Sequence, residues 1–135
     1  MKRYQNILFV CGLAAFISFA AFAGAQFKSF TADSRDGHAV LKWETTTEVN
    51  VERFAVERSS DGQEFHEIAT FPPHGANVEY RYIDTSIFKQ TVRSYHYRIR
   101  CDDAQGHSQY SETRRVHVVV SGIQQTWGSI KALFR

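Results

Sequence analysis

The sequence predicts an all-β fold, a seven-stranded antiparallel sandwich that follows an N-terminal signal peptide and precedes a short helical tail. Three observations support this prediction. Short runs rich in Val, Ile, Tyr, Phe and Thr alternate between apolar and polar residues along most of the chain. Clusters of Gly, Asp, Asn and Ser separate these runs at intervals of about ten residues. No helical period of useful length appears before residue 122.

Residues 1–25 have the layout of a secretory signal peptide. Two basic residues near the N-terminus precede an uncharged apolar run that ends in the small-residue sequence AFAGA. Two Ala-x-Ala frames suit a signal peptidase, one ending at Ala23 and one at Ala25. We expect cleavage after Ala25, so that Gln26 begins the mature chain. The alternative is an uncleaved membrane anchor, because the apolar run is nearly long enough to span a bilayer.

Cleavage after residue 25 leaves 110 of the 135 residues, which suits one domain with one core. We place the sandwich at 26–121 and the tail at 122–135. The signal carries two of the 16 basic residues and none of the 14 acidic ones, so the mature chain has no formal net charge. We therefore expect no attraction to nucleic acid. Of the two cysteines only Cys101 remains, so the domain has no internal disulfide.

Seven runs are predicted to be strands. Their ranges are 27–33, 38–46, 53–59, 64–71, 79–84, 94–101 and 109–120. The third and fourth runs are expected to form a hairpin, because Asp61 and Gly62 between them supply the positive backbone dihedrals of a tight turn. Pro72 and Pro73 end the ladder after the fourth run.

Alternation within the strands assigns the inward positions to the core. The predicted core residues are Leu41, Trp43, Phe54, Val56, Tyr95, Tyr97, Ile99 and Cys101. Because Cys101 continues the inward series of its strand, we expect a buried and unreactive thiol. Seven short strands, with a buried Trp on the second and a Tyr opening the sixth, are typical of immunoglobulin-like and fibronectin type III-like sandwiches.

The order of motifs after residue 40 is distinctive. The segment LKWETTTEVNVERFAVERSSDGQEFHEIATF is followed by YRYID, YHYRIR and DAQGHSQYSE. In these motifs the chain resembles the fibronectin type III-like domain of secreted Bacteroidetes proteins, and the resemblance covers residues 27–120. Such domains often precede a C-terminal sorting signal for type IX secretion. The resemblance implies an exported domain and identifies no ligand.

Motifs that would indicate catalysis are absent from the sequence. It contains no G-x-S-x-G, no H-E-x-x-H and no Gly-rich phosphate loop, so we expect no enzyme, no catalytic residue and no cofactor. His96 and His117 are predicted to face solvent on adjacent strands. Zinc would need further ligands that no Cys or carboxylate is placed to supply, so no metal site is expected. The segment DDAQG, residues 102–106, is predicted to be a plain hairpin turn.

Two other polar groups are given structural roles. Glu48 and Asn50 are expected to cap loop amides with their side chains rather than to contact a ligand. Five charged residues are expected to form a solvated face of the sheet, which discourages edge-to-edge aggregation. They are Arg58, Arg98, Arg100, Glu57 and Glu112.

The tail at 122–135 changes period. Ile123, Trp127, Ile130 and Phe134 fall at spacings of four, three and four, so a helix would gather them on one stripe. We expect this stripe to dock on the sandwich, on a partner protein or on a membrane surface, with Trp127, Ile130 and Phe134 as interaction anchors.

We therefore expect an exported noncatalytic interaction or adhesion module, secreted, periplasmic or on the cell surface, that binds a protein or a polysaccharide. The alternative is an accessory carbohydrate-binding or small hydrolytic protein of the cell envelope. That alternative requires exposed aromatics on one face or paired carboxylates in a cleft. The inward phase of Trp43 and of most Tyr and Phe residues leaves few aromatics to form a sugar platform.

Overall fold

The computed structural model describes residues 23–87 and 93–118. Within these ranges the chain is all-β, with eight strands in antiparallel pairs and no helix, and hence no helix that could cross a membrane. The strands are β1 (Gly24–Arg35), β2 (His38–Val49), β3 (Val51–Ser59), β4 (His66–Phe71), β5 (Glu79–Asp84), β6 (Arg93–Asp103), β7 (Ser108–Tyr110) and β8 (Arg114–Val118). Most of the predicted signal peptide, and the predicted anchors Trp127, Ile130 and Phe134, lie outside the described residues.

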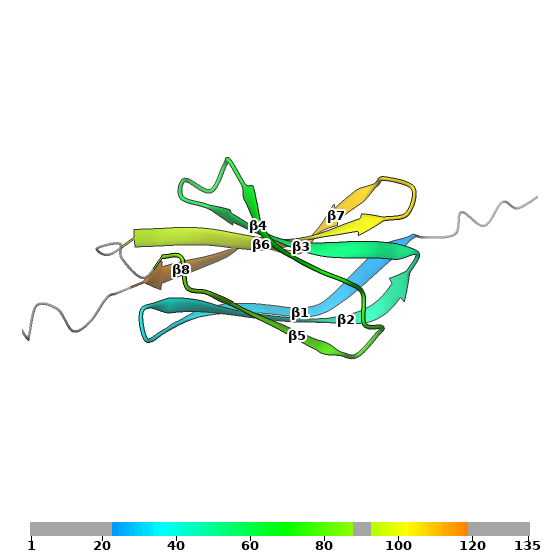
Figure 1. The fold of residues 1–135 in the computed structure, drawn as a ribbon, viewed down its shortest axis with the longest axis horizontal. Helices are drawn as coiled ribbons and strands as arrows, with labels where there is room; N and C mark the ends of the chain where they lie inside the picture. The colour runs from blue at the N-terminus through cyan, green and yellow to red at the C-terminus, as the bar shows by residue number, and fades with distance from the viewer. Residues whose placement is uncertain (1–22, 88–92, 119–135) are drawn as a thin grey trace, which may run out of the picture.

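Two sheets face each other in a sandwich (Figure 1). The first sheet has the order β1-β2-β5, and the second has the order β4-β3-β6, with β7 and β8 both paired to β6. On one side β1 contacts β7 and β8 of the opposite sheet. We call this line of contact between β1 and the strands β7 and β8 the seam. Two hydrogen bonds of 3.2 Å cross it, one from the Ala25 amide to Gln109 Oε1 and one from Arg114 Nε to the Phe30 carbonyl.

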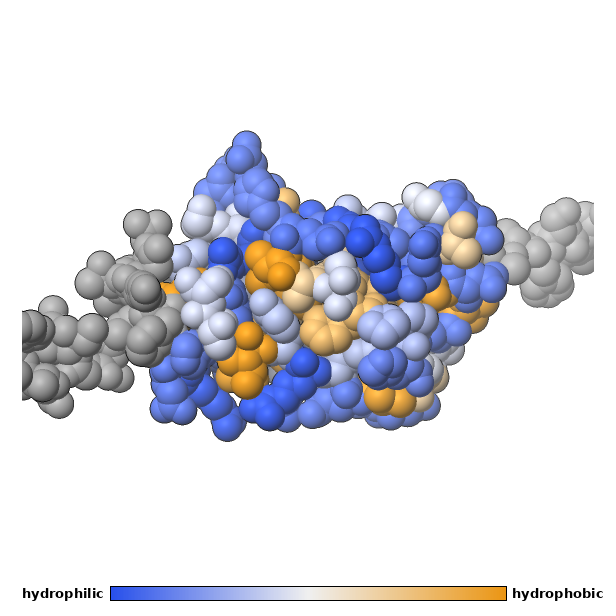
Figure 2. All heavy atoms as spheres, viewed as in Figure 1, coloured by the Kyte–Doolittle hydropathy of each residue, from blue (hydrophilic) through white to orange (hydrophobic). Residues whose placement is uncertain are grey.

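The other side of the sandwich lies between the edge strands β4 and β5. Figure 2 shows a largely hydrophilic face on which hydrophobic side chains gather in the middle, between these two strands. Phe71 of β4 and Tyr82 of β5 are partly buried against the core, and their rings meet edge to face at 6.0 Å. The two sides therefore differ, since polar bonds close one and aromatic packing fills the other.

The hydrophobic core lies between the sheets. The eight residues that alternation placed inside are all 7% exposed or less. Trp43 stacks on Tyr80 with ring centroids 5.1 Å apart and meets Phe71 edge to face at 5.2 Å, the geometries that aromatic pairs prefer. Cys101 is buried and forms no disulfide within the described chain. Burial raises the pKa of its thiol to about 11, which makes it a poor nucleophile.

The hairpin between β3 and β4 differs from the prediction. The two strands do pair antiparallel, but Gly62 has a positive φ of 79° and Asp61 does not. Asp61 Oδ1 instead accepts bonds from the amides of Gln63 at 2.8 Å and Glu64 at 3.0 Å, and such bonds lower its pKa to about 2. An Asp side chain that bonds its own loop makes a longer turn, so β4 begins at His66 rather than at residue 64.

The last predicted strand, 109–120, is divided into β7 and β8, so the described strands number eight rather than seven. Ser111 causes the division. Its amide donates to the Ile99 carbonyl at 2.9 Å, while its Oγ accepts from the Ile99 amide at 2.8 Å. Because a side-chain oxygen takes the place of a backbone carbonyl, the ladder is interrupted here.

This interruption inserts one extra residue into the edge strand. Tyr110 lies opposite Arg100 and Arg114 lies opposite Tyr97, so between these pairs three edge residues face two residues of β6. Such a bulge inverts the alternation of side chains. Uninterrupted alternation would give Tyr110 the inward phase of Val116, yet Tyr110 is 50% exposed.

Candidate functional site

Tyr110 is the most exposed large hydrophobic residue in the described part of the chain, and its ring packs on Arg98. The guanidinium carbon of Arg98 lies 4.2 Å from the Tyr110 ring centroid and 4.0 Å from that of Phe65. A guanidinium between two ring faces makes favourable cation–π contacts with both. Arg98 Nε also donates to Glu57 Oε2 at 2.7 Å. These contacts hold Tyr110 in a defined position on the outer face of its sheet.

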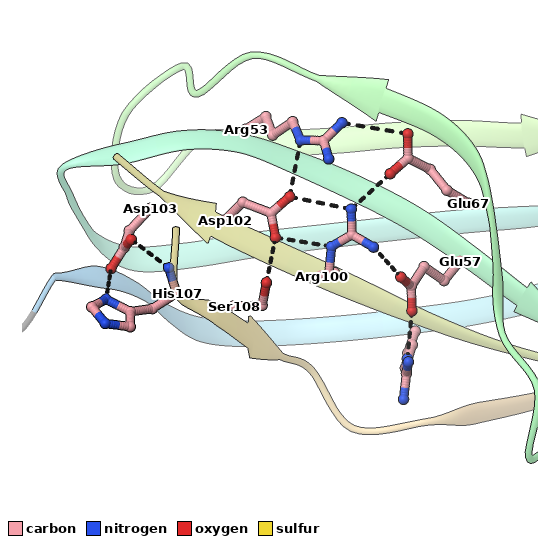
Figure 3. Close-up of polar contacts among 9 residues, drawn as sticks. Arg53, Glu57, Glu67, Arg100, Asp102, Asp103, His107 and Ser108 are labelled. Atoms are coloured by element: carbon pink, nitrogen blue, oxygen red, sulfur yellow. Dashed lines mark hydrogen bonds and ion pairs between the residues drawn. The ribbon is translucent and has the colours of Figure 1, made fainter. Parts of the chain in front are cut away.

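An ion network lies beside Tyr110 on the same sheet, and Figure 3 shows its contacts. It consists of Arg53, Glu57, Glu67, Arg98, Arg100 and Asp102. Arg100 donates to Glu57 at 2.5 Å, to Glu67 at 2.7 Å and to Asp102 at 2.9 Å. The bond to Asp102 is the main cause that raises the pKa of Arg100. Arg53 Nε donates to the other oxygen of Asp102 at 2.9 Å.

The prediction of a solvated charged face is wrong for two of its members. Glu57 is only 4% exposed, so the network packs as a layer over the sheet. Arg58 does not belong to it, because Arg58 shares the inward phase of Phe54 and Val56 and donates to Asp84 at 2.7 Å. Arg98 and Arg100 do lie in the network, beside Tyr110.

Asp84 lies at the centre of a second polar cluster and is itself fully buried. It accepts bonds from Arg58 at 2.7 Å and Tyr97 at 2.9 Å, and from the amide and hydroxyl of Ser86 at 3.0 and 2.6 Å. Burial alone would raise the pKa of Asp84, but these bonds outweigh it and the pKa lies below its usual value. Four donors fill the carboxylate's acceptor positions, so the Asp84 cluster joins β3, β5 and β6 and leaves no position for a ligand.

Glu48 and Asn50 both shape loops, by different means. Glu48 accepts a bond from the Gly75 amide at 2.9 Å and another from the Tyr80 hydroxyl at 2.9 Å. Burial raises the pKa of Tyr80 to about 12. Asn50 has a positive φ of 52°, and its carbonyl accepts from the Ala104 amide at 3.0 Å. Glu48 thus caps a loop amide with its side chain, whereas Asn50 acts through its backbone.

The two histidines considered for zinc are not directly paired. His96 lies opposite Arg115, and His117 lies opposite Ser94, whose Oγ is 2.8 Å from His117 Nδ1. Among residues 23–87 and 93–118, no group of three or more His, Cys, Asp or Glu side chains could hold a metal ion.

The turn between β6 and β7 is organised by one carboxylate. Asp103 Oδ1 accepts bonds from the amides of Gln105 at 2.9 Å and His107 at 2.8 Å, and its Oδ2 lies 3.1 Å from His107 Nδ1 (Figure 3). Burial would raise the pKa of Asp103, but these bonds lower it overall. This carboxylate therefore builds the hairpin turn that presents Tyr110.

Three open depressions of the described surface meet at Tyr110. One is lined by Ala25, Gln26, Phe27, Thr47 and Gln109, a second by Phe27, Lys28, Ser29, Phe30, Ser111 and Glu112, and a third by Glu52, Arg53, Arg100, Asp102, Asp103, Gly106 and Ser108. Tyr110 lines all three, and we call these residues together the Tyr110 surface. It combines an exposed aromatic ring with amide and hydroxyl groups that both donate and accept hydrogen bonds.

Sequence reasoning missed Tyr110 because it continued one strand through residues 111–113. A signal was present, since three polar residues, Ser111, Glu112 and Thr113, interrupt the alternation there. The anchors that the sequence did predict, Trp127, Ile130 and Phe134, lie outside the described residues.

No family model matches the chain, and no curated protein matches it. A family 76 glycoside hydrolase from a bovine Bacteroides thetaiotaomicron strain is similar in structure, with 11% identity and a TM-score of 0.54 over 73% of this chain and 21% of that chain. A β-1,2-glucanase from Parabacteroides distasonis is 20% identical, with a TM-score of 0.48 over 74% of this chain and 13% of that chain. The chain therefore spans about a fifth or less of either structure. At this identity the likeness is one of fold, an all-β arrangement of antiparallel sheets.

Proposed function

We propose that the chain is an exported, noncatalytic binding module that holds a glycan at the Tyr110 surface. The observation that carries this proposal is the exposed Tyr110 ring, shared by three depressions that amide, hydroxyl and charged side chains line. A sugar ring presents apolar C–H faces, which pack on an aromatic ring, and hydroxyls, which exchange hydrogen bonds with amides and carboxylates. The Tyr110 surface offers partners for both.

The rigidity of the site supports a binding role. Arg98 lies between Phe65 and Tyr110 and is bonded to the nearly buried Glu57. A ring that is already held in place loses little conformational freedom when a ligand arrives, and this lowers the entropic cost of binding. The interruption of the edge strand exposes the Tyr110 ring, and the ion network holds that ring in position through Arg98.

The carboxylates near the site support a noncatalytic role. Hydrolysis of a glycosidic bond needs two carboxyl groups, one to protonate the leaving oxygen and one to act as base or nucleophile. In the described part of the network, Glu57, Glu67 and Asp102 each bond to arginines at 3.4 Å or less. Burial would raise the pKa of Asp102, but its bonds to Arg100 and Ser108 lower it overall, so this carboxylate is a poor general acid.

Two further considerations support an exported glycan-binding domain. The sandwich has three strands in one sheet and four in the other, if β7 and β8 are counted as one interrupted strand. This arrangement fits the fibronectin type III-like sandwich that the sequence motifs resemble, and we propose that class for this domain. The family 76 enzyme of similar fold is by its name a glycoside hydrolase, so glycans are the first ligands to test. A protein partner is the competing outcome.

The test is a binding screen of the full chain, recovered from the envelope and culture medium of expressing cells. A glycan array that includes glucans, mannans and xylans identifies ligands, and titration calorimetry measures their affinity. We expect Tyr110→Ala to weaken binding by about tenfold or more, roughly 1.4 kcal/mol. The matched control is Ile83→Ala, which removes a side chain 40% exposed on the other sheet, and its affinity should equal that of the wild type.

Each other outcome decides between named alternatives. Glycan binding that survives Tyr110→Ala contradicts the assignment of the site. Binding only to a protein, lost in Tyr110→Ala, keeps the surface and replaces the ligand class. Release of reducing ends from a bound glycan favours the small hydrolytic protein over the noncatalytic module.

A further inference from the structure

Strand β1 begins before the residue that the sequence analysis placed at the mature N-terminus. Gly24 pairs with Val49, and Ala25 pairs with Glu48, as the first two steps of the β1–β2 ladder. Ala25 is 5% exposed and belongs to the hydrophobic core. A mature chain that began at Gln26 would lack both pairs and this buried side chain.

The contacts of these two residues are specific to their positions. The Ala25 amide donates to Gln109 Oε1 at 3.2 Å across the seam. A Cβ at residue 24 would lie 2.2 Å from Gln109 Oε1, so the end of the Gln109 side chain packs directly against Gly24. Residues 24 and 25 are therefore fitted parts of the seam.

Ala25 also lies near Cys101. Both residues belong to the buried core, and the Ala25 amide bonds to the side chain of Gln109, the residue paired with Cys101 in the sheet. Ala25 further lines the depression next to Tyr110. Loss of residues 24 and 25 would open both the thiol and one wall of that depression.

We propose that the signal peptidase cleaves the Ala23–Gly24 bond, so that Gly24 begins the mature chain. Water supplies the hydroxyl that joins the Ala23 carbonyl carbon and the hydrogen that joins the Gly24 nitrogen. The sequence offers both frames, because small residues stand at both required positions in each, and the frame expected from the sequence ends at Ala25. The fold favours the other frame, because cleavage after Ala23 preserves all of β1 and cleavage after Ala25 removes its first two residues.

The first experiment is intact mass measurement and N-terminal sequencing of the exported protein from its own host. We expect a chain that begins at Gly24. A chain that begins at Gln26, which is two residues shorter and able to cyclise to pyroglutamate, would overturn the proposal. A chain that retains residues 1–25 would overturn it together with the signal-peptide prediction.

A second experiment uses the substitution Ala21→Leu, which lies outside the described domain. It spoils the frame that ends at Ala23 and leaves the frame that ends at Ala25 intact. We expect the N-terminus to move to Gln26, with a lower melting temperature and faster reaction of Cys101 with a thiol reagent. Phe22→Leu, which touches neither frame, should leave Gly24 as the first residue. A Gln26 chain that melts and reacts like the wild type would contradict the role given to residues 24 and 25.

Discussion

The Asp84 cluster and the Tyr110 surface contain the same kinds of residue, but the carboxylate of the first is buried and the ring of the second is exposed. Each combines a tyrosine, an arginine, a carboxylate and a serine. In the Asp84 cluster Arg58, Tyr97 and Ser86 together direct four hydrogen bonds at one fully buried carboxylate. At the Tyr110 surface the ring is 50% exposed, and the surrounding amides and hydroxyls face open depressions.

We infer from this difference that saturation of hydrogen-bonding groups, and not residue type, separates the structural cluster from the proposed binding surface. A buried carboxylate with four donors has no capacity left and contributes only to stability. An exposed ring such as Tyr110, which packs on the Arg98 guanidinium, contributes little to stability, and its other face is open to a ligand. The two regions should therefore respond in opposite ways to substitution.

The largest effect is expected from a comparison of two aromatic truncations. Trp43→Ala should lower the free energy of unfolding by about 3 to 5 kcal/mol, because it empties the centre of the core. Tyr110→Ala should cost less than about 1 kcal/mol, since it removes an exposed ring and one cation–π contact. Urea denaturation measures both. Equal losses would show that Tyr110 is packed inside and that the bulge is misplaced.

A second comparison concerns two carboxylates. Asp84→Ala should cost about 3 kcal/mol, the lower end of the range for breaking a buried ion pair, because the Arg58 side chain keeps 25% of its exposure. Asp102→Ala should cost about 1 kcal/mol, since the network it leaves lies at the surface. If both variants unfold at the same urea concentration, the distinction between a saturated interior and an open network fails.

A smaller effect is expected from pH. The pKa of Asp84 is lower in the folded chain than in the unfolded one, so its contribution to stability is present above the unfolded pKa and is lost as pH falls. The free energy of unfolding should therefore decline below roughly pH 4. In Asp84→Ala this decline should be shallower. An unchanged acid profile would mean that the Asp84 carboxylate is not held ionised by its neighbours.

Alternation along the strands was enough to predict most of the fold. It placed the second strand with Leu41 and Trp43 inward and the sixth with Tyr95 and Tyr97 inward, and all four are buried. This succeeded because a sheet with one buried face imposes a strict period of two. The same period would also place Asp84 inward, since Asp84 shares the phase of Tyr80 and Tyr82 in the sequence, but Asp84 is not among the core residues predicted from the sequence. A charged residue in an inward phase predicts a buried partner.

The candidate site could not be derived in the same way. The exposure of Tyr110 depends on one extra residue in the edge strand between β7 and β8. This residue reverses which face of the sheet the β7 side chains point to, relative to those of β8. Periodicity finds the regular parts of strands, whereas a bulge depends on the hydrogen bonds between Ser111 and Ile99. The depressions around Tyr110 also join β1 to β7, two strands far apart in the sequence, and only the closed sandwich brings them together.

The measurement that tests the central claim most directly is an NMR titration of the isotopically labelled chain with the glycan that binds best in the array screen. The account expects backbone amide shifts to change at Gln26, Thr47 and Gln109, around Tyr110, while those of Ile83 and the rest of β5 stay constant. Shifts confined to β5 or spread evenly over both sheets, or the absence of any glycan that shifts the Tyr110 surface, would contradict it.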